Sequence, residues 1–397
     1  MPCDVGVALS RKTIGTGTTR LGVATCTADF RFGVAGGVRI DTLWPGASNC
    51  AANTPIGTSA TLAAAGITFI ESGTYAGGVA TRLRGERERI FMDKTAALQT
   101  VKFNCYGWGG VSGCTEVDRT HASTGITYSG SPWFADFTVP MLASYTVADD
   151  GGNNSAAWIT ADGANVDNAQ PLCHSTAGGD VTCQVKSART SLRGTDMGGS
   201  HYGSGLSSLF FTIRYGEITN AINKGLTYLS HGLKCVIDAH RFYYYSHSPG
   251  YTYIATQRDG YASPTTYAGT NPNLVPGALL TLQSSFNTAA GGGNITTAVG
   301  SILAETVKRF GIIPIDDTTW NAVMISVEDG PAGSVHTELS GLGYTLDYDP
   351  PSLAGGNAFY KDIKAIFEGL YIVTNATTGA LGGGGSPAYG TPAPPSF

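Results

Sequence analysis

Charged residues are scarce in this sequence of 397 residues: Asp, Glu, Lys and Arg together make up 13%, whereas an ordinary soluble domain has about a quarter. The 24 basic and 29 acidic side chains leave a formal net charge of −5, and no long Lys/Arg run occurs. Such a chain has little with which to neutralise a phosphate backbone. The composition therefore argues against a nucleic-acid partner, and against an anionic membrane surface for the same reason.

Several signatures of function are also missing. No run of about 18 apolar residues predicts a membrane span, and neither a Walker loop nor a dinucleotide fingerprint occurs. Gly203-Ser204-Gly205 is not a nucleophile elbow, because Tyr202 breaks the surrounding motif. The sequence predicts no cofactor and no catalytic constellation. Met1-Pro2-Cys3-Asp4 lacks the basic and apolar segments of a signal peptide, so we expect the numbering to start at a mature chain.

Cysteine, in contrast, is present in an even number, and no CxxC or CxxCH motif points to zinc, redox chemistry or haem. We expect four disulfides in an oxidising, extracellular location, with buried free thiols as the alternative. Spacing suggests loop staples for Cys105 with Cys114 and for Cys173 with Cys183. Of the 105 possible pairings, we select one that uses all eight cysteines: Cys105–Cys114, Cys173–Cys183, Cys26–Cys50 and Cys3–Cys235.

Glycine (55) and tyrosine (19) are abundant, as in wall, sheath and fibre proteins. In the first residues, Val5, Val7 and Leu9 alternate with small side chains, so they share one face of a strand. This strand is either the first of its own sheet or a donor strand that completes a neighbouring subunit by β-augmentation.

Short apolar runs separated by Gly, Ser and Thr predict a mainly β fold. We expect an extended strand over 1–14, an Ig-like or β-sandwich region over 15–115, and a larger jelly-roll-like β-sandwich over 116–381. A Gly/Pro-rich tail over 382–397 should be mobile in an isolated molecule. The alternating charges of Arg82–Arg89 indicate a solvated strand face or hairpin, and Ser207–Tyr215 is among the stronger strand predictions.

Two amphipathic helices interrupt the second sandwich. The first has apolar side chains at 299, 302, 303, 307 and 310, and Gly311 stands at the position of a C-terminal cap. The second begins at Asn357 as its N-cap and continues to Leu370. Both helices should lie against a sheet.

Potential reactive groups are spread along the chain. Asp238 and His240 would share a face of one strand, with His231 on the other, but satisfied polar residues are the better interpretation than a metal site. Paired acids for glycoside cleavage could come from 316–317, 328–329 or 347 with 349. Sequence alone cannot place any of these pairs at catalytic separation, so we predict no metal site and no enzyme.

The aromatic run that contains Tyr243, Tyr244 and Tyr245 is dense enough to stack on glycans or to contact another subunit, with sheet packing as the alternative. Asn153, Asn294 and Asn375 each begin a glycosylation sequon, so we expect a glycoprotein if the cell modifies such sites.

Residues Gly203–Glu217 and Leu229–Lys234 resemble a pattern in secreted bacterial proteins of unknown function. There a Gly-Ser-Gly-Leu-Ser segment leads to an Ile/Val-Arg-x-x-Glu strand and then to a His-Ala-Leu strand. The resemblance extends over roughly 130–330, although Gly232 stands where Ala is usual. It implies a secreted β-sandwich or jelly roll and brings no activity. Residues 1–115 have no such counterpart.

Together these features predict a structural subunit of an extracellular filament or pilus-like surface assembly, joined to copies of itself by Val5, Val7 and Leu9. A glycan-binding wall or matrix protein is the first alternative. A secreted carbohydrate-active enzyme is the second.

Overall fold

The computed structural model describes residues 34–35, 38–39, 45–71, 79–105, 129, 133–147, 152–245 and 248–390. Strands outnumber helices among these residues, which confirms the mainly β prediction. Val5, Val7 and Leu9 lie outside the described residues, so the donor strand stays a prediction. Among the described residues, no helix is both long enough and apolar enough to cross a membrane.

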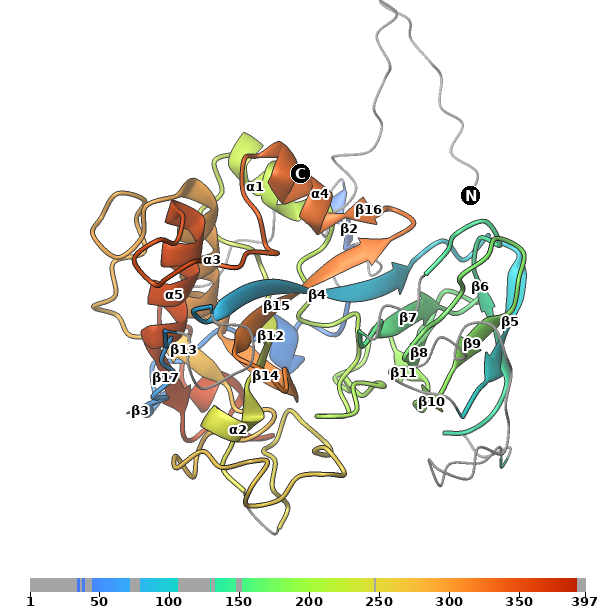
Figure 1. Cartoon of the computed structure of the whole chain (residues 1–397), viewed down its shortest axis with the longest axis horizontal. Helices are drawn as coiled ribbons and strands as arrows, with labels where there is room; N and C mark the ends of the chain where they lie inside the picture. The colour runs from blue at the N-terminus through green and yellow to red at the C-terminus, as the bar shows by residue number, and fades with distance from the viewer. Residues whose placement is uncertain are drawn as a thin grey trace, which may run out of the picture.

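One mixed sheet forms the frame of the molecule, with strand β4 near its centre (Figure 1). The neighbouring pairs β7/β4, β4/β15 and β12/β14 are parallel, whereas jelly rolls and Ig sandwiches are antiparallel; those architectures are not confirmed. The sheet order is β10 (Val185–Lys186), β8 (Asn165–Gln170), β7 (Ala156–Ile159), β4 (Arg82–Phe91), β15 (Ala322–Gly330), β12 (Leu233–Ile237), β14 (Ile312–Asp317), β13 (Leu280–Leu282), β17 (Leu370–Val373) and β3 (Leu62–Ala64), with β11 (Thr190–Ser191) on β8 and β16 (Gly333–Ser334) on β15.

A smaller sheet lies beside this frame, on the right in Figure 1. In it, β5 (Leu98–Phe103) lies between β6 (Phe137–Pro140) and β9 (Val181–Cys183). A separate apolar core lies between this smaller sheet and the strands β4, β7 and β8. Trp158 of β7 is fully buried in it and stacks on Phe91 of β4, with the ring centroids 5.3 Å apart. A separate short pair joins β1 (Val34–Ala35) to β2 (Val38–Arg39).

The main core on one face of the large sheet includes side chains of the helices α1 (Glu217–Asn223), α3 (Ala298–Phe310), α4 (Val335–Gly341) and α5 (Ala358–Glu368). Both helices expected from the sequence are confirmed. Thr297 caps α3 and Asn357 caps α5, each accepting a backbone N–H with its side chain. The short elements α2 (Ala239–Phe242), η1 (Ala51–Asn53) and η3 (Leu381–Gly383) lie in connections.

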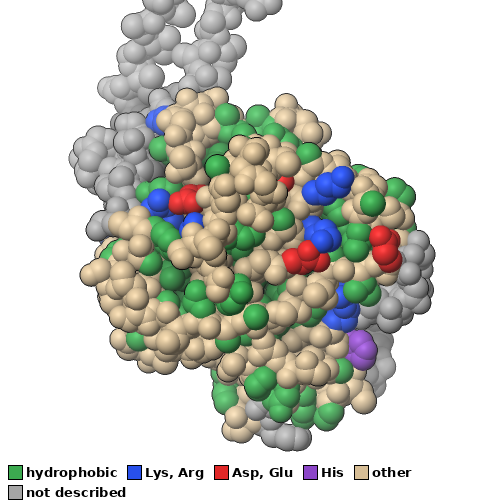
Figure 2. Space-filling view, turned by 90° about the vertical axis from the view of Figure 1, so that its left-hand side faces the viewer, with side chains coloured by type: hydrophobic (Ala, Val, Ile, Leu, Met, Phe, Trp, Pro, Cys, Tyr) green, Lys and Arg blue, Asp and Glu red, His purple; other side chains and the backbone are tan. Residues whose placement is uncertain are grey.

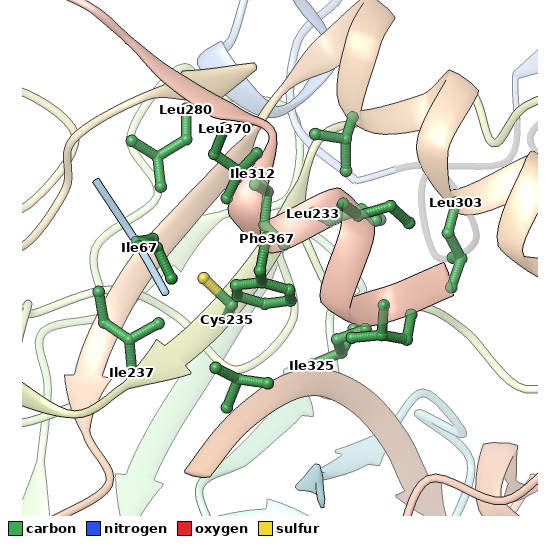
Figure 3. Close-up of a cluster of buried hydrophobic side chains, with 14 of the residues drawn as sticks. Ile67, Leu233, Cys235, Ile237, Leu280, Leu303, Ile312, Ile325, Phe367 and Leu370 are labelled. Atoms are coloured by element: carbon green, nitrogen blue, oxygen red, sulfur yellow. The ribbon is translucent and has the colours of Figure 1, made fainter. Parts of the chain in front are cut away.

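The alternation of strand side chains divides the two faces of the sheet. On β12, Leu233, Cys235 and Ile237 belong to the core beneath the helices, and Figure 3 shows Cys235 beside the ring of Phe367 from α5. Val236 points the other way, into a second apolar cluster. The face opposite the helices therefore carries the remaining side chains of β4, β12, β14 and β15.

The charged segment 82–89 differs most from expectation. It is neither a solvated face nor a hairpin but part of the long strand β4, and Glu86 and Glu88 are buried. The segment 207–215 is also not a strand, although most of it is buried. Since β3 and β4 pair with β17 and β15 in one sheet, the boundary predicted at residue 115 does not separate two sheets.

All four predicted disulfides are wrong. Cys183 and Cys235 are buried free thiols, so neither Cys173–Cys183 nor Cys3–Cys235 forms. Burial raises the pKa of the Cys183 thiol to about 12. Cys50 and Cys105 are also thiols and not members of a disulfide, so the pairs Cys26–Cys50 and Cys105–Cys114 are wrong as well.

The Gly/Pro-rich tail packs on its own chain as far as residue 390. Gly57 donates its N–H to Gly382 at 2.8 Å, and Ala388 donates to Ile56 at 2.8 Å. The first part of the tail therefore has its packing partner in segment 56–59 and needs no neighbouring subunit.

Figure 2 shows the side of the molecule that faces left in Figure 1. Uncharged side chains cover most of this view, and acidic and basic ones lie in small mixed groups. The scarcity of charge in the sequence is thus visible at the surface.

Candidate active site

A cavity of about 520 Å³ opens on the sheet face opposite the helices. Val236 of β12 and Met324 of β15 form part of its wall. We call it the acidic cavity, because its lining combines four carboxyl groups with three large aromatic side chains: Glu86, Asp259, Asp316, Asp317, Tyr202, Tyr261 and Trp320. Acids and aromatics in one concave site are an arrangement typical of ligand binding.

Glu86 lies in the middle of β4 and is 7% exposed. Burial, together with the nearby charges of Glu88 and Asp316, raises the pKa of Glu86 to about 7, while His201 opposes the change. An acid with such a pKa can hold and release a proton near neutral pH. Alternation along the strand places Glu86 and Glu88 on the same face.

Glu88 is bound from two sides by buried cations. His201 Nε2 lies 2.9 Å from Glu88 Oε1, and Lys234 Nζ lies 2.9 Å from the same oxygen. Burial favours the neutral acid, but His201 and Lys234 outweigh it and lower the pKa of Glu88. Lys234 also donates to the carbonyls of Ser207 and Ser208, at 2.8 and 3.0 Å.

His201 connects this buried pair to the cavity wall. Its Nδ1 lies 3.6 Å from Asp316 Oδ2. Burial disfavours the imidazolium, but Glu88 and Asp316 raise the pKa of His201 to about 9. The site therefore has a cation fixed behind Asp316, whose carboxylate also accepts from Asn153 Nδ2 at 3.3 Å and from the Asp317 N–H at 2.9 Å.

The loop that carries His201 can approach Asp316 only because residue 203 is glycine. A Cβ at Gly203 would lie 2.6 Å from Asp316 Oδ1 and 2.9 Å from its Cα. Any larger residue at position 203 must displace this carboxylate or the loop.

Asp259 and Asp317 complete the acidic lining. Tyr267 donates its hydroxyl to Asp259 at 2.6 Å, and burial with the nearby Asp316 raises the pKa of Asp259 to about 7. Asp317 accepts from the Ala239 N–H at 2.9 Å and from the Tyr261 hydroxyl at 3.0 Å. Burial raises the pKa of Asp317 as well.

Gln170 adds a feature that points to a ligand. Its side chain lines the acidic cavity and is 1% exposed, yet its Oε1 has no hydrogen-bond partner among the residues that the structure describes. Buried acceptors are normally satisfied. A hydroxyl-bearing ligand in the cavity would supply the missing donor.

Comparison with protein-family models, with curated proteins and with solved structures finds no match.

The histidine cluster considered in the sequence is dispersed by the fold. Strand β12 ends at Ile237 and α2 follows, so Asp238 and His240 do not share a strand face. His231 instead lies 3.0 Å from Glu217, and His240 Nδ1 lies 2.9 Å from the Thr265 carbonyl. Among the described residues, no group of three His, Cys, Asp or Glu side chains could hold a metal ion.

Of the acid pairs named from the sequence, only 316–317 lines the acidic cavity. Glu328 binds Arg214 at 2.8 Å in the interior, and Asp329 binds Arg89 at 2.8 Å. Asp347 and Asp349 form ion pairs with arginines of β4.

The tyrosine run does not form one stacking surface. Tyr243 is fully buried and donates to the Asp316 carbonyl at 3.1 Å, so it supports the site from below. Tyr244 is 37% exposed, and the Arg258 guanidinium lies over the half-buried ring of Tyr245.

The three sequon asparagines differ in environment. Asn153 is half-buried and donates to Asp316, which favours a role in the site over a glycan attachment. Asn375 donates its amide to the Ser59 and Gly383 carbonyls, both at 3.0 Å. Asn294 is exposed, and its glycosylation stays a prediction.

The sequence interpretation missed Glu86, Asp259, His201 and Gln170. One signal was available for Glu86: two glutamates spaced by two in a strand that ends in Ile90 and Phe91 share one face. For the other residues no local pattern marks the site, because they come together only through the tertiary fold.

Proposed function

We propose that this protein is a carbohydrate-active enzyme that cleaves glycosidic bonds by acid–base catalysis in the acidic cavity. The observation that carries the proposal is Glu86, a buried acid with a pKa of about 7, in a cavity lined by further carboxyl groups and aromatic rings. Two carboxyl groups in different environments are the usual equipment for this reaction. An extracellular location fits such a role and is part of the proposal.

Glu86 is the general acid. Its proton passes to the glycosidic oxygen as the bond between that oxygen and the anomeric carbon breaks. The oxygen of a water molecule bonds to the anomeric carbon, and the proton released by that water passes to Asp316, the general base. Proton exchange with solvent then restores both groups.

The neighbouring residues prepare these two roles. His201 and Asn153 hold Asp316 in position, and Glu88 disfavours the anion of Glu86. Trp320, Tyr202 and Tyr261 offer large apolar faces with polar edges, which suit sugar rings. Gln170 Oε1 would accept a sugar hydroxyl.

The test is the release of reducing ends from a panel of polysaccharides. Glu86→Gln should lower the rate about 10²–10⁴-fold, the usual contribution of a general acid. Glu305→Gln on α3, which carries the same change on the helix face, is the control and should leave the rate unchanged.

The pH profile gives an independent readout. Because the acid must be protonated, activity should fall as pH rises through about 7, the pKa of Glu86. A wild-type chain that releases no sugar, or a Glu86→Gln variant as active as the wild type, would overturn the proposal. Retention of glycans without cleavage would instead favour the glycan-binding alternative.

A further inference from the structure

A second cavity, of about 450 Å³, adjoins the acidic cavity. We call it the arginine cavity, because Arg84 and Arg87 line it and do not line the acidic one. The two cavities have several wall residues in common: Glu86, Gly152, Asn153, Trp320 and Met324. Glu86 therefore lies between two spaces, each large enough for a small ligand.

The pairing of β4 explains this second opening. Strand β7 pairs only with residues 89–91 of β4, whereas β15 runs along residues 82–88. The first part of β4 therefore has an edge that β7 does not cover. The segment around Tyr348 approaches this edge, forming an isolated bridge to Leu83, and places Asp347 in the wall of the arginine cavity.

The two cavities differ in charge. Asp259, Asp316 and Asp317 line only the acidic cavity, whereas the arginine cavity has Arg84, Arg87 and a single further acid, Asp347. The Arg87 side chain is 40% exposed, and its Nη2 lies 3.0 Å from Asp347 Oδ2. A guanidinium carries five N–H donors in a fork that matches carboxylate and sulfate oxygens.

Trp320 lies at the junction and has a fixed environment. The guanidinium carbons of Arg82 and Arg84 lie 5.2 and 5.3 Å from the centroid of its ring, within the range of a cation–π contact. The aromatic wall shared by the two cavities is thus held beside positive charge on the arginine side.

We propose that the two cavities form one cleft for an anionic polysaccharide, which binds across Glu86 with an acidic sugar residue in the arginine cavity. This inference rests on the proposed glycoside-cleaving function and names its substrate class. The carboxylate or sulfate of that sugar faces Arg84 and Arg87, and the neighbouring sugar in the acidic cavity carries no charge.

The experiment measures binding to the full chain carrying Glu86→Gln, which removes the acid and so protects the probe from cleavage. The probes are hexasaccharides in which acidic and neutral sugars alternate, of the hyaluronan and unsulfated chondroitin types, each beside its methyl-esterified form. At least one acidic hexasaccharide should bind about tenfold or more tightly than its neutral form.

A second substitution in that background locates the effect. Arg87→Ala should lower the affinity for the acidic hexasaccharide about tenfold, equivalent to about 1.4 kcal/mol. The affinity for the neutral form should not change. Lys361→Ala removes an exposed positive charge from α5 and should change neither affinity. Equal affinity for both forms, an acidic preference that survives Arg87→Ala, or no binding of any acidic probe would overturn the inference.

These outcomes are separable from those of the proposed function. If the wild type cleaves neutral polymers but neither binds nor cleaves acidic ones, the proposed enzymatic function is supported and the anionic cleft is refuted. If acidic hexasaccharides bind in the expected way but no polymer is cleaved, the cleft is supported as a binding site and the proposed glycoside cleavage is refuted.

Discussion

Replacement of Glu86 by glutamine should stabilise the protein in alkaline solution. Burial raises the pKa of Glu86 from 4.5 to about 7, so the folded state binds its proton more tightly than the unfolded state does. The stability that this group contributes is fully present below the unfolded pKa and is lost as pH rises through the folded pKa. Glutamine has nearly the same shape and cannot ionise, so it escapes this loss.

The size of the effect follows from the two pKa values. Each unit of pKa difference is worth about 1.4 kcal/mol, so the loss for Glu86 amounts to about 3 kcal/mol well above pH 7. Between about pH 5 and about pH 8.5, the free energy of unfolding of Glu86→Gln should gain about 2.5 kcal/mol relative to the wild type. Urea unfolding of both proteins at the two pH values measures this difference.

Glu88→Gln is the matched control, because it makes the same change two residues along the same strand. The pKa of Glu88 is lowered by His201 and Lys234, so its charge stabilises the fold above the unfolded pKa. This variant should lose about 3–5 kcal/mol at alkaline pH, as expected when one partner of a buried ion pair is removed. Two results would refute the reasoning. One is a loss of stability in Glu86→Gln as large as that in Glu88→Gln. The other is a difference in the free energy of unfolding between Glu86→Gln and the wild type that does not change with pH.

Two further predictions concern the support of the site. Lys234→Met removes a fully buried cation that binds Glu88 and two carbonyl groups, so it should lower the free energy of unfolding by about 3–5 kcal/mol. The control Lys361→Met, at an exposed position, should lower it by less than about 0.5 kcal/mol. Equal effects of the two substitutions in urea titrations would contradict the buried network. Gly203→Ala places a Cβ 2.6 Å from Asp316 Oδ1 and should reduce the rate of sugar release more than about tenfold. The control Gly341→Ala, where nothing lies within 4 Å of the added atom, should leave the rate unchanged. Unaltered kinetics in Gly203→Ala would contradict the role proposed for Asp316.

The elements with strong local patterns were predictable. The helices α3 and α5 have apolar stripes at helical spacing and side chains at their N-caps, and both form where the sequence placed them. Strand β15 also follows its apolar run. In these segments local propensity and burial favour the same conformation.

Prediction failed where burial depends on distant partners. Arg82–Phe91 has the charge pattern of an exposed strand. Its glutamates are nevertheless buried, because β15 pairs with this strand and because His201 and Lys234 contact Glu88. Segment 207–215 is apolar enough for a strand, but the fold uses it as a buried irregular cover whose carbonyls bind Lys234. The disulfides predicted for Cys183 and Cys235 likewise do not form, because both side chains are interior thiols.

The sequence by itself determined the mainly β character, the two amphipathic helices and the scarcity of surface charge, because these depend on composition and on short-range periodicity. Only the tertiary structure decided that β4 lies within a mixed sheet and that Glu86, Asp259 and Asp316 line one cavity. These acids come from segments more than 50 residues apart, and their charge states depend on burial and on each other. Proximity and desolvation of this kind arise only when the chain is folded.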